Sequence, residues 1–494
     1  MPAVTSPAKA AAVLVLAVLS MPTAANASAP LTPGPPPSVA TPPILNVPPA
    51  PGTAWVLGYS EGSPLSPISL SSGDLGTPVK ITRGFDDDAL AITPDGRTAY
   101  VAQNVTDTVV SVNLAAGTNG GLIDVGQEPT AVAVTPNGQT AYVVTGGPQI
   151  GGGGIVPIDT ATNTAGAPIR AGLVPTAIAV APDGQTAYVV NEISDSLTPI
   201  DLATEKPETP IYPVTSPYSG GSELAGIAIT PNGTTAYVVN DRWTSSTPNE
   251  VVPVDLATGK AGTPIHLGDP QGTPRNIAIA PNGLSAYVTE IVLKSGYGSA
   301  VVPIDLATGV ASAPIYLGEQ GHSRVVVEPW SIAISPDGRF AYVADEGVGW
   351  VTPIDLATNT AEAPVRTGYK SEAVAIAPDQ APVASFIVHL ARAGSPSTFD
   401  GSASTSSTSP IATYHWDFGD GTGLPTSVPE VQHTYTQPGR YVVTLVVTDQ
   451  AGTSTAQVFT GQTMSNNGGP QARTERRIAI VGRTVIVVPT LKFR

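Results

Sequence analysis

One phrase recurs along most of this 494-residue chain. It reads SPDGRFAYVADEGVGWVTPIDLATNT at 335–360, and near-copies stand at 181–206 and 230–260. Repeats of about 40–50 residues with strand-like content are typical of β-propeller blades. Aligning the copies on Pro-(Asp/Asn)-Gly and Ala-Tyr-Val gives seven aromatic positions, spaced 42 to 55 residues apart: Trp55, Tyr100, Tyr142, Tyr188, Tyr237, Tyr287 and Tyr342.

Each repeat predicts four strands. An apolar run such as AVAVT (131–135) leads through a Pro-Asn-Gly or Pro-Asp-Gly turn into Ala-Tyr-Val, the second strand. The third strand ends in Asp-Leu-Ala-Thr, and the fourth reads APIRA, TPIHL or APIYL. The aspartates Asp201, Asp255, Asp305 and Asp355 are expected to cap their own turns, with Gly259, Gly309 or Asn359 in the left-handed conformation.

The two ends of the repeat array complement each other. AVAIAPD (373–379) is an inner strand with no Ala-Tyr-Val after it, and Thr53-Ala54-Trp55 has no inner strand before it. The inner strands are apolar at nearly every position, as expected when both faces of a sheet are covered. The sequence therefore predicts an all-β fold that begins with a seven-bladed propeller over 54–380, closed by its last strand.

These residues resemble the YVTN-type, YncE-like and lactonase-like seven-bladed propellers. The similarity covers the whole predicted ring and implies the fold, since such propellers host binding, lactone hydrolysis and other roles. Residues 381–463, with YHWDFGDGTG (414–423) and HTYTQPGRY (433–441), resemble a PKD domain, an Ig-like β-sandwich. We expect Trp416 in its core, a turn at 417–421, and Tyr441, Val443 and Leu445 alternating inward.

The two ends of the chain carry other signals. Lys9, an apolar run at 10–21 and Ala25-Asn26-Ala27 predict a signal peptide over 1–27, and 28–53 is a proline-rich linker. We therefore expect a secreted or cell-surface protein without a transmembrane segment in its mature form. Residues 464–494 form a basic tail, for which we favour an added strand on the sandwich over contact with acidic envelope polymers.

Composition excludes several functions. The chain has no cysteine, which rules out disulfides, thiolate catalysis and iron–sulfur clusters. Its net charge of −16 disfavours nucleic acid as a partner. We predict no cofactor and a monomer.

The connections from the second to the third strand, and from each blade to the next, should share one face of the propeller, here called the loop face. The positions eight and six residues before each turn proline should lie at the mouth of that face. They supply an acidic rim, made of Asp86, Asp88, Glu128, Glu223, Glu328 and Glu372. Arg275 and Lys370 occupy equivalent positions and lie between these acids. Such a rim could attract a divalent cation or a cationic ligand. Solvated loop charges are the plainer interpretation.

One histidine lies in a loop of this face. His322 with Arg275 and Glu328 could activate water against a lactone carbonyl, although a loop of mixed polarity is the simpler interpretation. Gly58-Tyr59-Ser60-Glu61-Gly62 matches G-x-S-x-G but lacks the strand–turn–helix context of a nucleophile elbow.

The leading functional hypothesis is a noncatalytic binding protein of the cell envelope or extracellular space. It would hold a protein or carbohydrate ligand on the loop face, with the PKD-like domain as a spacer or adhesion module. The alternative is a lactonase-like hydrolase that uses His322, Arg275 and Glu328.

Overall fold

A computed structural model describes residues 52–59, 64–81, 89–146, 153–214, 223–242, 249–268, 272–292, 299–317, 328–407, 409–459, 464–481 and 484–486. Regular structure in these ranges is almost entirely β-strand, with two short 3-10 helices, η1 (Asn104–Thr106) and η2 (Pro470–Ala472). Within the same ranges, no helix is long and apolar enough to cross a membrane.

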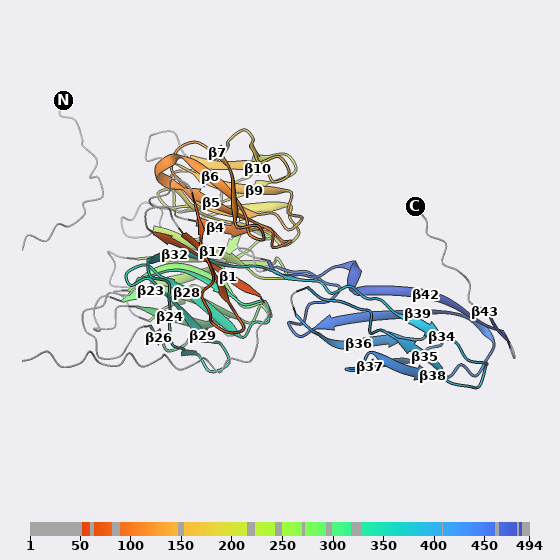
Figure 1. Cartoon of the computed structure of the whole chain (residues 1–494). Helices are drawn as coiled ribbons and strands as arrows, with labels where there is room; N and C mark the ends of the chain where they lie inside the picture. The colour runs from red at the N-terminus through yellow and green to blue at the C-terminus, as the bar shows by residue number, and fades with distance from the viewer. Residues whose placement is uncertain are drawn as a thin grey trace, which may run out of the picture. The chain divides into compact units, whose positions relative to one another are not determined.

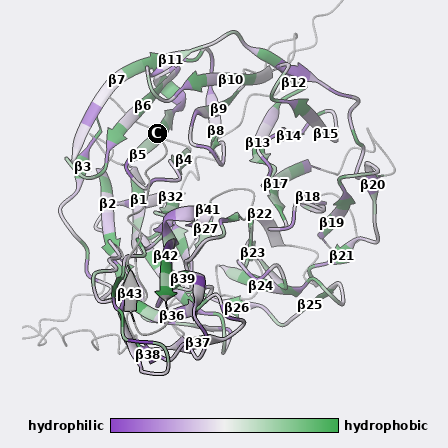
Figure 2. Ribbon diagram, turned by 90° about the vertical axis from the view of Figure 1, so that its right-hand side faces the viewer, coloured by the Kyte–Doolittle hydropathy of each residue, from purple (hydrophilic) through white to green (hydrophobic). Residues whose placement is uncertain are grey.

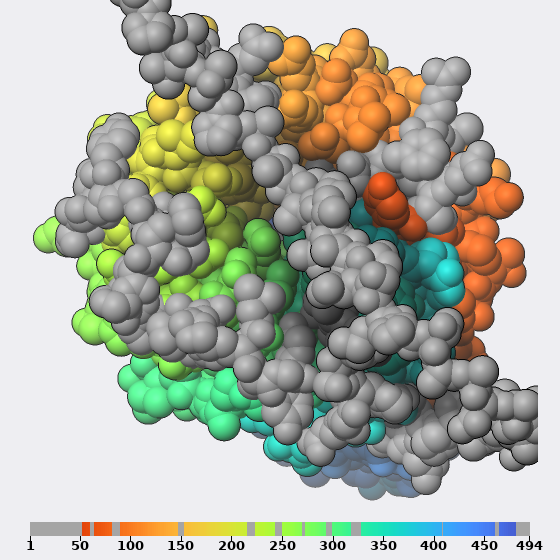
Figure 3. Space-filling view, turned by 90° about the vertical axis from the view of Figure 1, so that its left-hand side faces the viewer, coloured from red at the N-terminus to blue at the C-terminus, as the bar shows by residue number. Residues whose placement is uncertain are grey.

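The described residues between 53 and 376 form seven antiparallel sheets, which Figure 2 shows arranged around a ring. Figure 3 shows the ring from the opposite side, with the sheets following one another in chain order. We number them blades 1 to 7, blade 1 being the one that contains the first strand. The predicted seven-bladed propeller is confirmed.

Each blade is built from an inner, a second and a third strand, followed by outer strands of two to four residues, except in blade 2, whose outer strand has seven. The inner strands of blades 1 to 7 are β32 (Lys370–Ile376), β4 (Ala89–Ile92), β8 (Pro129–Val134), β13 (Pro175–Val180), β17 (Glu223–Ile229), β22 (Gly272–Ile279) and β27 (Pro329–Ile334). The second strands are β1 (Thr53–Tyr59), β5 (Thr98–Gln103), β9 (Thr140–Thr145), β14 (Thr186–Asn191), β18 (Thr235–Asp241), β23 (Ser285–Val292) and β28 (Phe340–Asp345). The third strands are β2 (Pro64–Ser69), β6 (Thr108–Asn113), β10 (Gly153–Asp159), β15 (Ser196–Asp201), β19 (Glu250–Asp255), β24 (Ala300–Asp305) and β29 (Trp350–Asp355).

The fourth strand is usually split in two, a detail that the sequence analysis missed. In blade 5, β20 (Lys260–Ala261) and β21 (Ile265–His266) both pair with β19. Pro264 stands between them and has no N–H to donate to the ladder. The other outer strands are β3 (Val79–Lys80), β7 (Thr118–Asp124), β11 (Thr164–Ala165), β12 (Ile169–Gly172), β16 (Lys206–Pro207), β25 (Val310–Ala311), β26 (Ile315–Tyr316), β30 (Thr360–Ala361) and β31 (Val365–Arg366).

The repeated aromatic residue joins each blade to the next. Tyr100 packs in the apolar cluster between blades 2 and 3, and its hydroxyl donates to Asn163 Oδ1 of blade 3 at 2.9 Å. Tyr287 reaches Asn359 of blade 7 in the same way at 3.4 Å. Burial raises the pKa of Tyr100 to about 12. The phrase therefore recurs because every copy fills one interface of the ring.

Blade 1 closes the ring as the sequence predicts. β32 pairs antiparallel with β1, with Ala54 opposite Ile376 and Val56 opposite Val374 (Figure 1). Val374 and Ile376 are 5% and 2% exposed and pack with Tyr342 of blade 7. Burying these two side chains contributes at most about 1.5–3 kcal/mol each.

Two kinds of turn recur on the face opposite the loop face. In the Pro-Asp-Gly turn, Asp95 Oδ1 accepts hydrogen bonds from Thr93 Oγ1 at 2.6 Å and from the Arg97 N–H at 3.1 Å. In the Asp-Leu-Ala-Thr turn, Asp255 Oδ1 accepts from the Thr258 N–H at 2.8 Å. Gly259 follows with φ +64°, the left-handed conformation that glycine adopts without strain.

The second domain is a sandwich of two sheets (Figure 1). One contains β34 (Ile387–His389), β35 (Ser397–Asp400) and β38 (Glu430–His433). The other is ordered β37 (Gly423–Thr426), β36 (Ile411–Asp417), β39 (Gly439–Asp449), β42 (Arg473–Val481) and β43 (Thr484–Ile486). A small third sheet joins β33 (Asp379–Gln380), β41 (Met464–Asn467) and β40 (Val458–Phe459).

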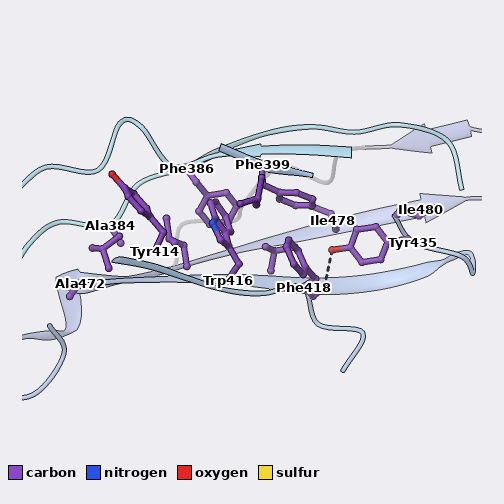
Figure 4. Close-up of a cluster of buried hydrophobic side chains, with 14 residues drawn as sticks. Ala384, Phe386, Phe399, Tyr414, Trp416, Phe418, Tyr435, Ala472, Ile478 and Ile480 are labelled. Atoms are coloured by element: carbon purple, nitrogen blue, oxygen red, sulfur yellow. Dashed lines mark hydrogen bonds between the residues drawn. The ribbon is translucent and has the colours of Figure 1, made fainter. Parts of the chain in front are cut away.

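Aromatic side chains fill the sandwich core, as Figure 4 shows. Trp416 is 0% exposed and meets the Phe386 ring edge-on at 5.1 Å. The Tyr435 hydroxyl donates to the Phe418 carbonyl at 2.9 Å. Val443 and Leu445 are fully buried. These positions agree with the expectation for a core tryptophan and an alternating strand.

The basic segment after residue 463 supplies strands to this sandwich. β42 pairs with β39 over eight residues, from Arg473 opposite Val446 to Ile480 opposite Gly439. Its first half is exposed, with Arg473 at 2.6 Å from Glu475, and its end buries Ile478 and Ile480. The structure thus places this part of the segment in an added strand.

Candidate functional site on the loop face

The inner strands begin at the loop face, and several predicted rim residues stand at these beginnings. Glu223 opens β17, Lys370 opens β32, and Glu328 immediately precedes β27. Glu128, with φ +48°, donates its backbone N–H to Asp107 Oδ1 at 2.9 Å. Asp86, Asp88 and His322 lie outside the described residues.

Arg275 connects three blades at this face. Its guanidinium lies over the ring of Trp330, 5.0 Å from the ring centroid. Arg275 is exposed on β22 of blade 6, and Trp330 is half-buried on β27 of blade 7. A guanidinium over an indole is the stronger form of cation–π contact. The stack therefore presents a flat cationic and aromatic surface to the solvent.

A buried acid of blade 5, Asp241, interacts with the same guanidinium. Asp241 is 6% exposed and pairs across the sheet with Glu223. Burial and the Glu223 charge raise the pKa of Asp241 to about 6, and the positive charge of Arg275 opposes that rise. Two acids, one arginine and one indole thus form a chain of neighbours from blade 5 to blade 7.

A second group surrounds Lys370 of blade 1. Its Nζ lies 3.1 Å from Glu346 Oε1 and 5.5 Å from the centroid of the Tyr59 ring. The hydrogen bond to Glu346 is the largest cause of the raised pKa of Lys370, and the Glu328 charge adds to it. The rim is therefore a set of paired charges beside aromatic rings.

The proposed catalytic cluster of His322, Arg275 and Glu328 stays a prediction, because His322 lies outside the described residues. Arg275 contacts Trp330, and Glu328 acts on Lys370. Among the interactions of the described residues, neither a hydrogen bond nor an ion pair joins Arg275 to Glu328. Glu372, assigned to the rim, is only 7% exposed and thus contributes little surface to it.

The sequence analysis missed one position in every blade: the second residue after Ala-Tyr-Val. This residue lies at the loop-face end of the second strand, and its side chain is polar and at most 9% exposed in blades 2 to 7: Gln103, Thr145, Asn191, Asn240, Glu290 and Asp345. In blade 1 the position is Gly58, and the Tyr369 ring occupies the space its side chain would need. The Tyr369 hydroxyl donates to Ser66 Oγ. The signal was present in the alignment, as a polar residue at a fixed place after an apolar strand.

These buried positions differ in charge around the ring. In blade 4, Asn191 Nδ2 donates to Thr198 Oγ1 at 2.9 Å. In blade 5, Asn240 Nδ2 donates at 2.9 Å to the carboxylate of Glu250, which is 3% exposed. That carboxylate also accepts from Arg242 at 3.0 Å, and its other oxygen lies 3.7 Å from His266 Nδ1.

Blades 6 and 7 place a carboxyl group at the position itself. Glu290 is fully buried, and its carboxylate packs against Gly272, where no side chain would fit. Asp345 Oδ2 accepts from Thr352 Oγ1 at 2.7 Å, while its Oδ1 has no hydrogen-bond partner among the described residues. Burial raises the pKa of Asp345 to about 7.

A divalent cation at the acidic rim stays a prediction, since Asp86 and Asp88 lie outside the described residues. In the part of the chain that the structure describes, no three His, Cys, Asp or Glu side chains are grouped to hold a metal ion. Three acids near the loop face each contact a cation or a hydroxyl: Glu346 pairs with Lys370, Glu250 with Arg242, and Asp345 with Thr352.

Comparison with known proteins agrees with the two domains. A family model for the PKD domain matches residues 379–463. No curated protein matches the chain.

Solved structures share the propeller. They include hydrazine synthase of Kuenenia stuttgartiensis (22% identity, TM-score 0.51, covering 60% of this chain and 92% of that one). A functionally unknown protein of Desulfotomaculum acetoxidans matches with 16% identity, a TM-score of 0.52 and coverage of 66% and 98%. The Pseudomonas aeruginosa periplasmic gluconolactonase PpgL matches with 16% identity and a TM-score of 0.52, and the match covers 66% of this chain and 99% of that one. At these identities the likeness shows the fold alone: the chain joins a seven-bladed β-propeller to a segment, 379–463, that matches the PKD domain.

Proposed function

We propose that this is an exported, noncatalytic binding protein that holds a protein or carbohydrate of the cell envelope on the loop face of its propeller. The PKD domain, a module typical of extracellular proteins, would act as spacer or adhesion unit. The observation that carries the proposal is the stack of Arg275 on Trp330 beside Asp241 and Glu223.

That stack has the chemistry of a recognition surface. Tryptophan and arginine dominate the binding energy of many interfaces, because a flat ring and a rigid guanidinium lose little entropy on binding. An indole face also fits the apolar face of a sugar, and the flanking carboxylates can accept hydrogen bonds from hydroxyl or ammonium groups. The paired acids and bases around the rings would contribute more to the specificity of binding than to its affinity.

The test is a glycan array, run with the full chain and two variants. We expect Trp330→Ala and Arg275→Ala to weaken binding of the captured glycan at least tenfold. Arg339→Ala is the matched control, because Arg339 lies over the Phe340 ring at 5.8 Å in the same blade, next to a turn of the opposite face. Binding by both loop-face variants at wild-type strength would rule out this surface.

The hydrolase alternative predicts a different result. The fold is shared with a periplasmic gluconolactonase, so a lactone-hydrolysis screen should run beside the array, with and without chelator. Turnover that disappears in a His322→Ala variant while glycan binding is absent would replace the binding proposal with the enzymatic one.

A further inference from the structure

Two buried aspartates, Asp379 and Asp449, interact with each other where the chain enters the second domain, and neither has a basic partner among the described residues. Asp379 is the first residue of β33, and Asp449 is the last residue of β39. Their side chains are 1% and 2% exposed. Among the described lysines, arginines and histidines, none forms an ion pair with either carboxyl group.

The oxygen atoms of the pair have few donors. Asp449 Oδ1 accepts from the Thr453 N–H at 2.9 Å. Within the described residues, Asp449 Oδ2 and both oxygens of Asp379 lack an N–H or O–H donor. A buried carboxylate normally accepts several hydrogen bonds, so three unsatisfied oxygens require an explanation.

The two carboxyl groups interact with each other. Burial is the largest cause that raises the pKa of Asp449, to about 7, and the charge of Asp379 and a hydrogen bond to it add to the rise. The opposing influences are the backbone N–H groups of Thr453 and Ala451. Two ionised carboxylates cannot share a buried site at low cost, whereas one proton turns one of them into a donor for the other.

We propose that Asp379 and Asp449 share a single proton, and that this proton makes the attachment of β33 to the sandwich dependent on pH. Because Thr453 occupies Oδ1 of Asp449, the bridge runs between Oδ2 of Asp449 and an oxygen of Asp379. When the proton leaves to solvent, both groups are anionic and repel each other in a site without a cation.

The location gives the bridge a mechanical effect. β33 begins two residues after β32, the strand that closes the propeller. It is only two residues long, so few hydrogen bonds hold it. It pairs in parallel with β41, Asp379 opposite Asn466 and Gln380 opposite Asn467. The Ala381 N–H donates to Asn467 O at 3.2 Å and the Ala384 N–H to Gln471 O at 2.8 Å. Repulsion between the carboxylates would therefore loosen the connection between the two domains.

Hydrogen exchange of the full chain tests this. We expect the protection factors of the Ala381 and Ala384 amides to fall about tenfold between pH 6 and pH 8.5, after correction for intrinsic exchange. In Asp379→Asn the amide donates to Asp449 at every pH, so the profile should be flat. Asp400→Asn is the matched control: Asp400 is a carboxylate of the same domain whose pKa is lowered by hydrogen bonds to Ser402, and its variant should keep the wild-type profile.

Other outcomes would overturn the proposal. Parallel profiles for the wild type and Asp379→Asn would exclude a shared proton. Restoration of protection at pH 8.5 by Ca²⁺, reversed by EDTA, would show that the pair holds a metal instead. Carboxyl ¹³C NMR of the wild type provides a reading without any substitution: one of the two groups should titrate near pH 7, and titration of both below pH 5 would refute the bridge.

Discussion

Blades 4 and 7 use the same buried position in opposite ways. Asn191 and Asp345 both end a second strand, both are 0% exposed, and both are hydrogen-bonded to a threonine of the third strand. The amide serves as donor to Thr198, whereas the carboxyl group accepts from Thr352. The same scaffold position is thus neutral in blade 4 and titratable in blade 7, while the strands around it are alike.

The contrast extends to neighbouring blades. Gln103 and Thr145 in blades 2 and 3 are neutral, while Glu250, Glu290 and Asp345 bury carboxyl groups in blades 5 to 7. The Arg275–Trp330 stack stands above that acidic half. The difference teaches that the repeat conserves shape and leaves the electrostatics of each blade free to vary.

Introducing a charge at the buried position of blade 4 should give the largest effect. Asn191→Asp removes the donor and places a carboxylate among the Val189 and Ser196 carbonyl oxygens, both within 3.3 Å of Asn191 Nδ2. We expect a loss of about 3–5 kcal/mol of unfolding free energy at pH 8. Chemical denaturation measures it, and an unchanged midpoint would contradict the burial argument.

Removing the charge from blade 7 should stabilise it. The pKa of Asp345 rises from 3.8 to about 7 on folding, so its contribution to stability is complete below pH 4 and is lost as pH rises towards 7. Asp345→Asn should therefore gain about 2 kcal/mol at pH 8, since a buried amide N–H offsets part of the benefit, and gain nothing at pH 4. Thermal unfolding across this range is the measurement; a gain independent of pH would show that the carboxyl group is not the cause.

The two threonines sharpen the comparison. Thr352→Val deprives the Asp345 carboxyl group of its hydrogen bond and should cost about 1.5–3 kcal/mol at pH 8, less at pH 5. Thr198→Val removes a neutral acceptor and should cost about 1 kcal/mol at both pH values. Denaturation of the two variants at both pH values distinguishes them. Equal pH dependence in both would mean that the halves do not differ.

The rim should matter least for stability. Arg275→Ala removes one exposed cation–π contact, worth about 0.5–1 kcal/mol, and the effect should equal that of Arg339→Ala within error. A much larger loss from Arg275→Ala would make Arg275 part of the framework of blades 5 to 7 rather than of their ligand surface.

The sequence predicted the ring because its signals are spaced regularly. Tyr100 and Tyr287 each lie in an interface, and Val374 faces Val56 as the incomplete first and last repeats required. The sequence analysis missed the split of the outer strand, because the residues on both sides of Pro264 read as one continuous segment.

The site was harder to predict. Glu223 and Arg275 could be predicted by counting back from the turn proline, because each lies on the inner strand that leads directly to that proline. Asp241 and Asp345 were missed because they begin what reads as a variable loop, and their burial depends on the neighbouring blade, which sequence spacing does not reveal.

The closure of blade 1 also determines how the molecule bears load. Thr53 and Ala377 are joined by a hydrogen bond of 3.0 Å at the same end of the β1–β32 pair, so the chain enters and leaves the propeller at one corner. Tension applied to the chain before Thr53 and after Ala377 would open this seam one hydrogen bond at a time, beginning at Ala54 and Ile376. Because the hydrogen bonds of the β1–β32 pair would break in sequence rather than all together, blade 1 would open at low force while the other six blades stay intact.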